Sequence, residues 1–308
     1  MKRALVILNP RARRGAAARS YDRIRTEVEA GFRVRDALLD GTGEWRRALD
    51  RARRERIERV VAVGGDGTVH AVANALLGDG TGLWSGVTLG AVGVGSSNDF
   101  HKPCHTRVRG VPVRIGTPAG RDAGIASWED ERGDRHTRWF FVSASLGLCA
   151  RANRRFSCER GTASWLSARS VDAAITASAM GALRHHANVG ARLCAVPNEP
   201  ERDVQLSNLG IMLTPYLAGS FHYGTGVELG QGKFAIHLCE GMTRLGLLRA
   251  MAELLGGRFG RAPGMSSWSS RSVSLELGRD EDLELDGELF RARRVRFEAF
   301  PHALSVCS

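Results

Sequence analysis

The segment of residues 59–78 constrains the fold of this chain most strongly, because it predicts a strand, a turn and a helix in immediate succession. Arg59–Val63 is an apolar strand candidate, and a helix over Thr68–Leu77 is closed by Gly78. The turn that joins them is Gly64-Gly65-Asp66-Gly67-Thr68. Its glycines let the backbone turn tightly and approach a phosphate closely, while the N–H groups of the new helix attract an anion. The segment predicts a phosphate-binding turn; an ordinary tight turn capped by Asp66 is the alternative.

The first third of the chain alternates predicted strands with predicted helices. Each strand candidate is a short apolar run, and each helix candidate repeats its apolar residues every three or four positions. The predicted strands are Arg3–Leu8, Phe32–Leu38, Arg59–Val63 and Val87–Val92, and the predicted helices are one starting at Ser20, Glu44–Glu58 and Thr68–Leu77. Such alternation is typical of a parallel, doubly wound sheet, whose ligands bind beyond the carboxyl ends of its strands.

The rest of the chain follows a different pattern. Trp139–Leu148 is one continuous strand-like run, Ala163–Leu183 favours helix, and Arg244–Leu255 is an amphipathic helix candidate. Short strand candidates between glycine-rich turns favour an antiparallel sandwich; they are Leu209–Thr214, Lys233–Leu238, Ser272–Leu277, Leu283–Leu285 and Arg294–Phe300. We therefore expect two domains, residues 1–118 and residues 119–296, with the tail 297–308 as a candidate to rejoin the first.

The composition is that of a globular protein from a reducing compartment. The 308 residues are 43% hydrophobic and 25% charged, which suffices for a core without covalent staples. The sequence predicts no membrane-spanning helix, which would need ~20 apolar residues, and no signal peptide. Its six cysteines contain no CxxC pair, so neither a zinc site nor a disulfide framework is indicated. We expect a cytoplasmic protein.

The positive charge of the chain is concentrated near its start. The formal net charge is +11, and residues 1–60 contain sixteen Arg and one Lys against nine acidic residues. Such a surface attracts nucleic acid, anionic lipid or a polyphosphate substrate. The sequence has neither zinc-finger spacing nor an aromatic RNA-binding motif, so we expect no nucleic acid partner. A merely solvated basic face is the alternative.

A second polar turn follows the next predicted strand. It reads Gly93-Val94-Gly95-Ser96-Ser97-Asn98-Asp99-Phe100. In a doubly wound sheet the two turns lie side by side at one edge, so Asp66 and Asp99 are expected to share one crevice. Carboxylates beside phosphates make chemical sense when a magnesium ion lies between them, or when one handles the proton of an acceptor.

At these residues the chain resembles the diacylglycerol kinase catalytic-domain family, in particular the bacterial lipid kinases related to sphingosine and ceramide kinases. The resemblance covers nearly the whole length. Its motifs occur in the family's order: Asn9-Pro10 followed by basic residues and Gly15, the GGDGT turn Gly64–Thr68, the Gly95–Phe100 loop with Ser96 in place of Thr, Asp122-Ala123-Gly124, and Asp286-Gly287-Glu288. The GGDGT turn alone is also shared with the NAD kinases.

The resemblance implies a nucleotide-binding α/β domain and a C-terminal β-sandwich domain, with the active site in the cleft between them. It implies ATP and Mg²⁺ as cofactors. The implied ATP-binding residues are Asn9, Thr42, Gly64, Gly65, Asp66, Gly67, Thr68, Val69, His70, Ser96 and Asn98. The implied catalytic acids are Asp66, Asp99, Asp122 and Glu288, with Glu288 as proton acceptor and with Asp66 and Asp99 as magnesium ligands.

Some positions depart from the family pattern. His70 and Ala71 replace Asn and Glu after the phosphate turn, and Ser143 replaces a frequent Asn. Gln231 stands where bacterial members carry a magnesium-binding Asp in the sandwich domain. Because a neutral amide binds magnesium weakly, we predict that magnesium enters only with the nucleotide. The alternative is that the loop shifts its register, so that Glu228 supplies the missing carboxylate. The loop is then expected to be held by Gln231 or by an ion pair of Lys233.

The resulting hypothesis is an ATP-dependent lipid kinase acting on diacylglycerol, a monoacylglycerol, a sphingoid base or a ceramide. Its Arg-rich face would dock peripherally on the anionic inner face of the membrane, and a homodimer is left open. One alternative is a kinase of a soluble acceptor, such as NAD or a polyol phosphate. Another is a non-catalytic lipid- or nucleotide-binding module, which would not need the acidic residues.

Overall fold

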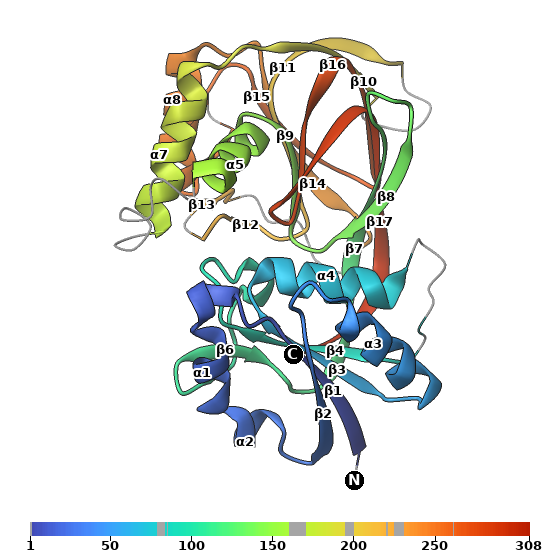
Figure 1. Ribbon diagram of the computed structural model, residues 1–308. Coiled ribbons are helices and arrows are strands. Elements are labelled where there is room, and N and C mark those ends of the chain that lie inside the picture. Colours follow the sequence, from blue (N-terminus) through green and yellow to red (C-terminus); the bar gives the residue numbers. More distant parts are fainter. Residues whose placement is uncertain are drawn as a thin grey trace. The chain divides into compact units, whose positions relative to one another are not determined.

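The computed structural model shows the chain as two compact units (Figure 1). Unit 1 comprises Met1–Arg121 and His302–Ser308, and unit 2 comprises Asp122–Pro301. The division lies a few residues beyond the boundaries expected at 118 and 296. The structure describes residues 2–78, 84, 86–159, 171–194, 200–219, 221–224, 231–260 and 262–308.

Unit 1 is built on a parallel sheet with the strand order β2-β1-β3-β4. The strands are β1 (Lys2–Leu8), β2 (Phe32–Leu38), β3 (Arg59–Gly64) and β4 (Thr88–Gly93). Each neighbouring pair is parallel, and Gly64 at the end of β3 pairs with Gly93 at the end of β4. The carboxyl ends of the strands, and the turns that follow them, therefore meet at one edge.

The faces of this sheet are covered by helices: α1 (Ala17–Asp22), α2 (Arg25–Val28), α3 (Glu44–Arg54) and α4 (Asp66–Leu77). Val6 of β1 shares an apolar cluster with Tyr21 of α1 and with Ile24, which directly precedes α2. Its neighbour Leu5 instead lines a pocket together with Ala48 of α3, because successive side chains of a strand point to opposite faces. The first unit is thus the doubly wound α/β layer that the sequence predicts.

Two predicted helices of unit 1 differ from the observed ones. The helix expected from Ser20 is divided into α1 and α2, because Ile24 has φ −117° and ψ 5°, outside the helical region. The helix expected to reach Glu58 ends at Arg54, and Arg56 has the left-handed φ of 51°. Tyr21, Ile24 and Val28 are nevertheless buried as the periodicity predicts.

Short elements complete unit 1: η1 (Ala12–Gly15), η2 (Asp99–His101), β5 (Arg107–Val108) and β6 (Val111–Arg114). β6 runs antiparallel to β4. The chain leaves for unit 2 within β7 (Pro118–Glu129) and returns within β17 (Glu288–Cys307). Val306 of the returning segment pairs in parallel with Leu89 of β4, so the C-terminal tail is part of unit 1.

Unit 2 is rich in antiparallel strands. Besides β7 and β17 they are β8 (Arg135–Phe140), β9 (Ser143–Gly147), β10 (Val189–Cys194), β11 (Arg202–Met212), β12 (Tyr216–Leu217), β13 (Phe221–His222), β14 (Phe234–Glu240), β15 (Met265–Ser270) and β16 (Ser272–Leu285). The main path runs β15-β14-β11-β10-β16-β17, and β9 pairs with both β11 and β16. One apolar cluster, which includes Leu209, Leu283 and Phe297, collects side chains from β7, β9, β10, β11, β14, β16 and β17.

Two predicted strands of unit 2 are organised differently. The run Trp139–Leu148 is interrupted after Phe140, because the carboxylate of Asp286 accepts the N–H groups of Phe141, Val142 and Ser143 at 2.8–3.0 Å. Those N–H groups turn away from the strand ladder at this corner. Conversely, the two short strands expected between residues 272 and 285 form the single strand β16, with a register shift between Glu276 and Glu281.

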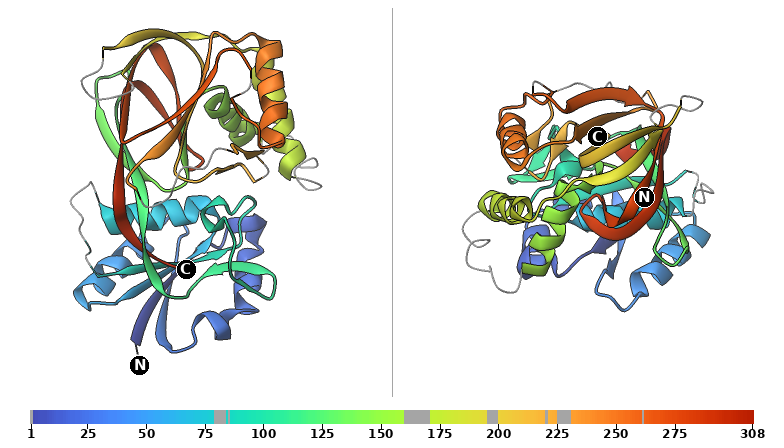
Figure 2. Two further views of the ribbon diagram at one scale, coloured as in Figure 1. Left: turned by 180° about the vertical axis from the view of Figure 1, so that it is seen from behind. Right: turned by 90° about the horizontal axis from the view of Figure 1, so that it is seen from above.

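Three helices complete unit 2: α5 (Leu148–Glu159), α7 (Val171–Arg184) and α8 (Arg244–Leu255). α7 and α8 run side by side (Figures 1 and 2). A second apolar cluster, with Leu183 and Leu247 among its members, joins these helices to the strands. The first part of the predicted helix Ala163–Leu183 lies outside the described residues. In the part of the chain that the structure describes, no helix is long and apolar enough to cross a membrane.

Candidate functional site

The two glycine-rich turns of unit 1 contact each other through their backbones. A Cβ atom added to Gly95 would lie 2.4 Å from the Cα of Gly65, and one added to Gly65 would lie 3.1 Å from the Cα of Gly95. The N–H of Val94 donates to the carbonyl of Gly64 at 2.9 Å. The turns therefore lie side by side, as the parallel strand order predicts, and glycine is required where they touch.

Asp66 ties the second turn to the start of α4. Its carboxylate accepts the N–H of Asp99 at 3.1 Å and the N–H of Phe100 at 2.9 Å. These are the first residues of η2, whose N–H groups have no partner within so short a helix. The structure thus assigns Asp66 a positioning function that its place in the turn does not reveal, and it places Asp66 beside Asp99.

Asn98 closes the second turn on itself. Its φ of 49° is left-handed, a conformation that Asn tolerates better than most residues. Its side chain accepts the N–H of Gly95 at 2.9 Å and donates to the carbonyl of Gly95 at 3.2 Å. Both observed hydrogen bonds shape the loop, while the side chain of Ser96 is exposed at its tip.

Asn9 and Thr68 are brought together although they are far apart in the sequence. The amide of Asn9 donates to the hydroxyl of Thr68 at 2.9 Å, and its carbonyl oxygen accepts the N–H of Arg11 at 3.0 Å. The backbone of Asn9 donates to Val63 at 2.9 Å. A Cβ on Gly64 would lie 2.1 Å from the Thr68 hydroxyl. The end of β1 is therefore locked to the phosphate turn that follows β3.

Asp99 is buried and paired with a cation. Its carboxylate lies 2.6 Å from the ammonium of Lys102. Nearby, Arg114 and Arg121 both donate to the carbonyl of Phe100, at 3.2 and 2.9 Å, and the Arg121 guanidinium lies 4.0 Å from the centre of the Phe100 ring. Cationic groups therefore surround the second turn, which suits an anionic ligand.

His101 is a buried residue of this region that sequence reasoning did not single out. Burial, with Arg114 nearby as a further cause, lowers the pKa of His101 to about 4. Its ring is therefore neutral at physiological pH. A histidine next to the Asn98-Asp99-Phe100 motif gave no signal of burial, because that burial comes from tertiary packing.

The remaining predicted ATP-binding residues of unit 1 lie in different environments. Thr42 precedes α3, where its N–H and hydroxyl both donate to Asp40, at 3.0 and 2.7 Å. Val69 and His70 are buried within α4, so only their backbone groups are available at the turn. The contacts described above join Asn9, the Gly64–Thr68 turn and Asn98, but none of them includes Thr42.

The four predicted catalytic acids are divided between the units. Asp66 and Asp99 belong to unit 1, whereas Asp122 and Glu288 belong to unit 2. Asp122 is buried, and its carboxylate accepts the N–H of Gly232 at 2.8 Å. Glu288 begins β17 and is exposed. Within unit 2, Asp122 is therefore held by a loop, while Glu288 faces solvent.

Asp286 and its neighbours form a buried acidic row that sequence reasoning did not assign. Besides Asp286, which holds the corner after β8, the row contains Glu281, Asp282 and Glu284 of β16. Glu281 pairs with Arg151 at 2.7 Å, and Glu284 accepts the hydroxyl of Ser145 at 2.7 Å. The sequence signal that could have identified this row is the high density of acidic residues around the D-G-E motif. Their partners could not be predicted, because they come from distant parts of the sequence.

The loop in which Gln231 replaces a family Asp is partly described. Gln231 and Lys233 are exposed, and between them Gly232 is buried against Asp122. Glu228 lies outside the described residues. An acid that the resemblance assigns to catalysis thus anchors this loop.

Asp66 and Asp99 are the acids of unit 1 that the resemblance assigns to magnesium. Within the described ranges, no group of three or more His, Cys, Asp or Glu is arranged to hold a metal ion. Magnesium, however, usually takes one or two carboxylates together with phosphate oxygens and water. A carboxylate oxygen has two lone pairs, so the hydrogen bonds to Asp66 are compatible with a cation there, while at Asp99 the cation would compete with Lys102. The donors fit an ion that arrives with phosphates.

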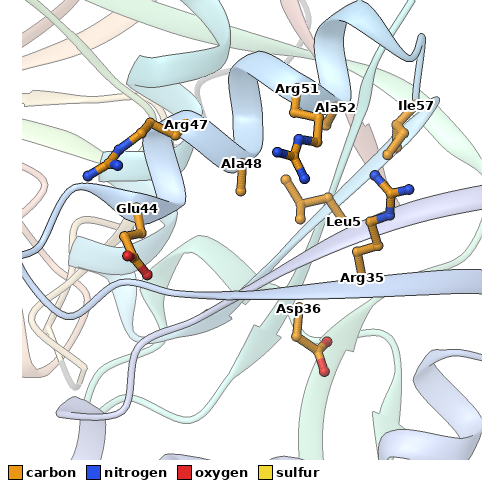
Figure 3. Close-up of a pocket in the computed structure, with 9 residues that line it drawn as sticks. All are labelled: Leu5, Arg35, Asp36, Glu44, Arg47, Ala48, Arg51, Ala52 and Ile57. Carbon is orange, nitrogen blue, oxygen red and sulfur yellow. The ribbon is translucent and has the colours of Figure 1, made fainter.

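A surface pocket of about 320 Å³ lies elsewhere in unit 1 (Figure 3). It lies between β2 and α3, and Arg35, Arg47 and Arg51 line it together with Asp36 and Glu44. Arg35 is already paired with Glu55 at 2.7 Å. Its lining includes none of the predicted site residues, so we do not identify this pocket with the site.

Comparison with known proteins relates the first part of the chain to one family. Residues 3–113 match the family model of the diacylglycerol kinase catalytic domain. The diacylglycerol kinase of Bacillus subtilis (strain 168) is 31% identical over 113 residues, which are 36% of this chain and 34% of that protein. The chain thus matches about a third of the length of this relative.

Solved structures extend the likeness in fold to almost the whole chain. A diacylglycerol kinase from Bacillus anthracis str. Sterne has a TM-score of 0.68 at 13% identity, covering 99% of this chain and 96% of that one. Yeast NADH kinase complexed with NADH has a TM-score of 0.51 at 10% identity, covering 99% and 82%. The fold is therefore of the class that both kinases share, with an α/β unit and a β-rich unit. Within that class, the match to the diacylglycerol kinase catalytic domain lies in residues 3–113.

Proposed function

We propose that the protein is an ATP-dependent lipid kinase, which transfers the γ-phosphoryl group of ATP to a hydroxyl of diacylglycerol, a monoacylglycerol, a sphingoid base or a ceramide. One observation carries the proposal. The Gly65 and Gly95 turns touch, and Asp66 ties them together, inside the segment that matches the diacylglycerol kinase catalytic domain.

In this proposal unit 1 binds the triphosphate. The first turn of α4 offers backbone N–H groups and the positive end of a helix dipole. Gly64 and Gly65 let this turn pack tightly against Thr68 and Gly95, where a Cβ would not fit. Asn9 and Thr68 keep this turn in place through their hydrogen bond, and the exposed Ser96 adds a hydroxyl donor from the neighbouring turn.

Asp66 and Asp99 are the residues that would hold magnesium. When bound together with ATP, the ion would neutralise negative charge on the phosphoryl oxygens. The task of the chain itself is to keep the two carboxylates adjacent, which the hydrogen bond from the Asp99 N–H to Asp66 achieves. Lys102, at 2.6 Å from Asp99, places a positive charge next to that buried carboxylate.

Unit 2 is proposed to provide the residues that act on the acceptor hydroxyl. Glu288 would accept the proton of the lipid hydroxyl, which a well-placed carboxylate does with a typical gain of ~10²–10⁴ in rate. Its exposed position at the start of β17 suits this function. Asp122 would help to position the lipid by holding the loop at Gly232, whose N–H it accepts.

Phosphorylation of a soluble acceptor is the second candidate. The observation that favours it is the likeness in fold to yeast NADH kinase over 99% of this chain. A non-catalytic binding module is less favoured, because simple binding requires no acidic pair next to a phosphate turn.

Peripheral binding to the anionic inner face of the membrane is part of the proposal. The chain carries a net charge of +11. Some N-terminal arginines are neutralised within the fold, since Arg3 and Arg35 both pair with Glu55. On α3, however, Arg46, Arg47, Arg51, Arg53 and Arg54 remain largely solvent-exposed. Each basic group near an anionic surface contributes about 1 kcal/mol.

A screen of acceptors separates these possibilities. ATP consumption by the full chain is measured with lipid micelles, with NAD, and with polyol phosphates, alongside ATP binding by calorimetry. Consumption that depends on a lipid acceptor supports the proposal. Consumption with NAD or a polyol phosphate alone would favour the second candidate, and ATP binding without turnover on any acceptor would favour a binding module.

A further inference from the structure

Helix α8 is apolar on two opposite faces. Its inner face buries Leu247, Ala250 and Leu254 in the second apolar cluster of unit 2. A helix packed in this way normally exposes a polar outer face to water. In α8 the outer face instead carries leucines.

Leu245 is 75% exposed, Leu255 is 58% exposed and Leu248 is 39% exposed. Since each residue of a helix is rotated by about 100°, these three positions fall within about 80° of arc, and the exposed Ala252 lies among them. We call Leu245, Leu248 and Leu255 the outer stripe. The neighbouring helix α7 adds exposed Met180.

The charges around the outer stripe are mostly positive. Arg244 and Arg249 lie on either side of it, and Arg258 follows the helix; all three are exposed. The acid of α8, Glu253, is largely buried and pairs with Arg249 at 3.3 Å. A continuous apolar strip with basic borders matches the interface of an anionic bilayer, where leucines enter the acyl boundary and arginines meet the headgroups.

We propose that α8 is a membrane-docking helix, which lays the outer stripe into an anionic bilayer. A second copy of the chain is a poorer partner, because each copy carries a net charge of +11 and like charges repel. This inference rests on the membrane part of the proposed function, and it names the element that inserts. It is also distinct from docking through α3, since insertion of leucines resists salt whereas purely electrostatic attraction is screened.

The test is sedimentation of the full chain with vesicles of phosphatidylcholine and phosphatidylglycerol, in the absence of ATP and acceptor. The variant L245Q/L255Q keeps good helix formers and removes the most exposed apolar surface. We expect its partition coefficient to fall by about tenfold or more. The matched control is Leu38→Gln, which alters a leucine that is 48% exposed on β2 of unit 1 and is expected to bind like the wild type.

Four further measurements separate membrane docking from stability, catalysis, purely electrostatic binding and dimer formation. The melting temperature shows that L245Q/L255Q is folded, and its turnover of a monomeric short-chain lipid is expected to match the wild type, so a loss of docking is distinguishable from a loss of kinase function. Wild-type binding that survives high salt supports insertion. Equal vesicle binding by L245Q/L255Q and the wild type would overturn the proposal. So would a wild-type dimer that this variant abolishes while vesicle binding is unchanged, which would make a second copy the partner.

Discussion

Substituting Gly95 with alanine perturbs the contact on which the phosphate site depends. The backbone at Gly95 is not left-handed, so alanine there brings no conformational strain of its own. Its Cβ, however, would lie 2.4 Å from the Cα of Gly65, whereas ordinary contact begins at 3.4 Å. The two turns would have to separate by at least 1.0 Å. Neither atom belongs to a flexible side chain, so the backbone itself must move.

The size of the effect follows from that displacement. Overpacking of a tight site costs about 1–3 kcal/mol of unfolding free energy, and a 1 Å misplacement of catalytic geometry costs about 10²-fold in rate. At Gly65 an added Cβ would lie 3.1 Å from Gly95, so that a shift of a few tenths of an ångström suffices. We therefore expect Gly95→Ala to be clearly more damaging than Gly65→Ala.

Thermal unfolding and phosphoryl transfer are measured for both variants and for Gly190→Ala. At Gly190 the nearest atom to an added Cβ is a side-chain nitrogen at 3.9 Å, which makes this variant a control for the general effect of exchanging glycine for alanine. The expected order of damage is Gly95→Ala, then Gly65→Ala, then Gly190→Ala. Equal melting temperatures and rates for Gly95→Ala and Gly190→Ala would refute the contact as a determinant of the site.

Further predictions concern acids and one histidine. Asp66→Asn keeps one accepting oxygen but places an NH₂ group opposite a backbone N–H, because both oxygens of Asp66 accept hydrogen bonds. We therefore expect turnover to fall by at least about 10²-fold together with a loss of about 1–3 kcal/mol of unfolding free energy; unchanged turnover would contradict this. Glu288→Gln should lower kcat by roughly 10²–10⁴ while ATP affinity, measured by calorimetry, stays the same. The pKa of His101 is lowered to about 4 in the folded protein. As the pH falls, this histidine is therefore protonated in the unfolded chain at a higher pH than in the folded chain. The contribution of neutral His101 is fully present above pH ~6.5 and is lost towards pH ~4, an effect of about 3 kcal/mol, and His101→Phe should weaken the acid dependence of denaturant unfolding.

Local patterns in the sequence predicted the first unit because its elements are separated by strong local signals. The glycines of the Gly64–Thr68 turn and Gly78 bracket α4, and the apolar runs before them are short. The break between α1 and α2 escaped prediction, since Ile24 continues the helical periodicity while its backbone leaves the helix. The interruption after Phe140 escaped for another reason. It is caused by Asp286, a residue far along the chain that no local pattern connects to this strand.

The adjacency of the two glycine turns was predictable, because parallel strands place their carboxyl ends at one edge. The hydrogen bonds of Asp66 to the backbone of η2 were not, since they depend on how the second turn folds back. Likewise, the loop anchor between Asp122 and Gly232 depends on a tertiary contact. Sequence motifs identify acids by type and order, whereas their partners are set by packing.

Transfer of labelled phosphate from ATP to a lipid is the direct test of the proposed kinase activity. The full chain is incubated with γ-labelled ATP, magnesium and mixed micelles of diacylglycerol, and the label is then followed into the lipid extract. We expect labelled phosphatidate to form with the wild type and to be strongly reduced with Asp66→Asn. Label that never enters the lipid phase with any hydroxyl-bearing lipid, but does appear on NAD or a polyol phosphate, would contradict it.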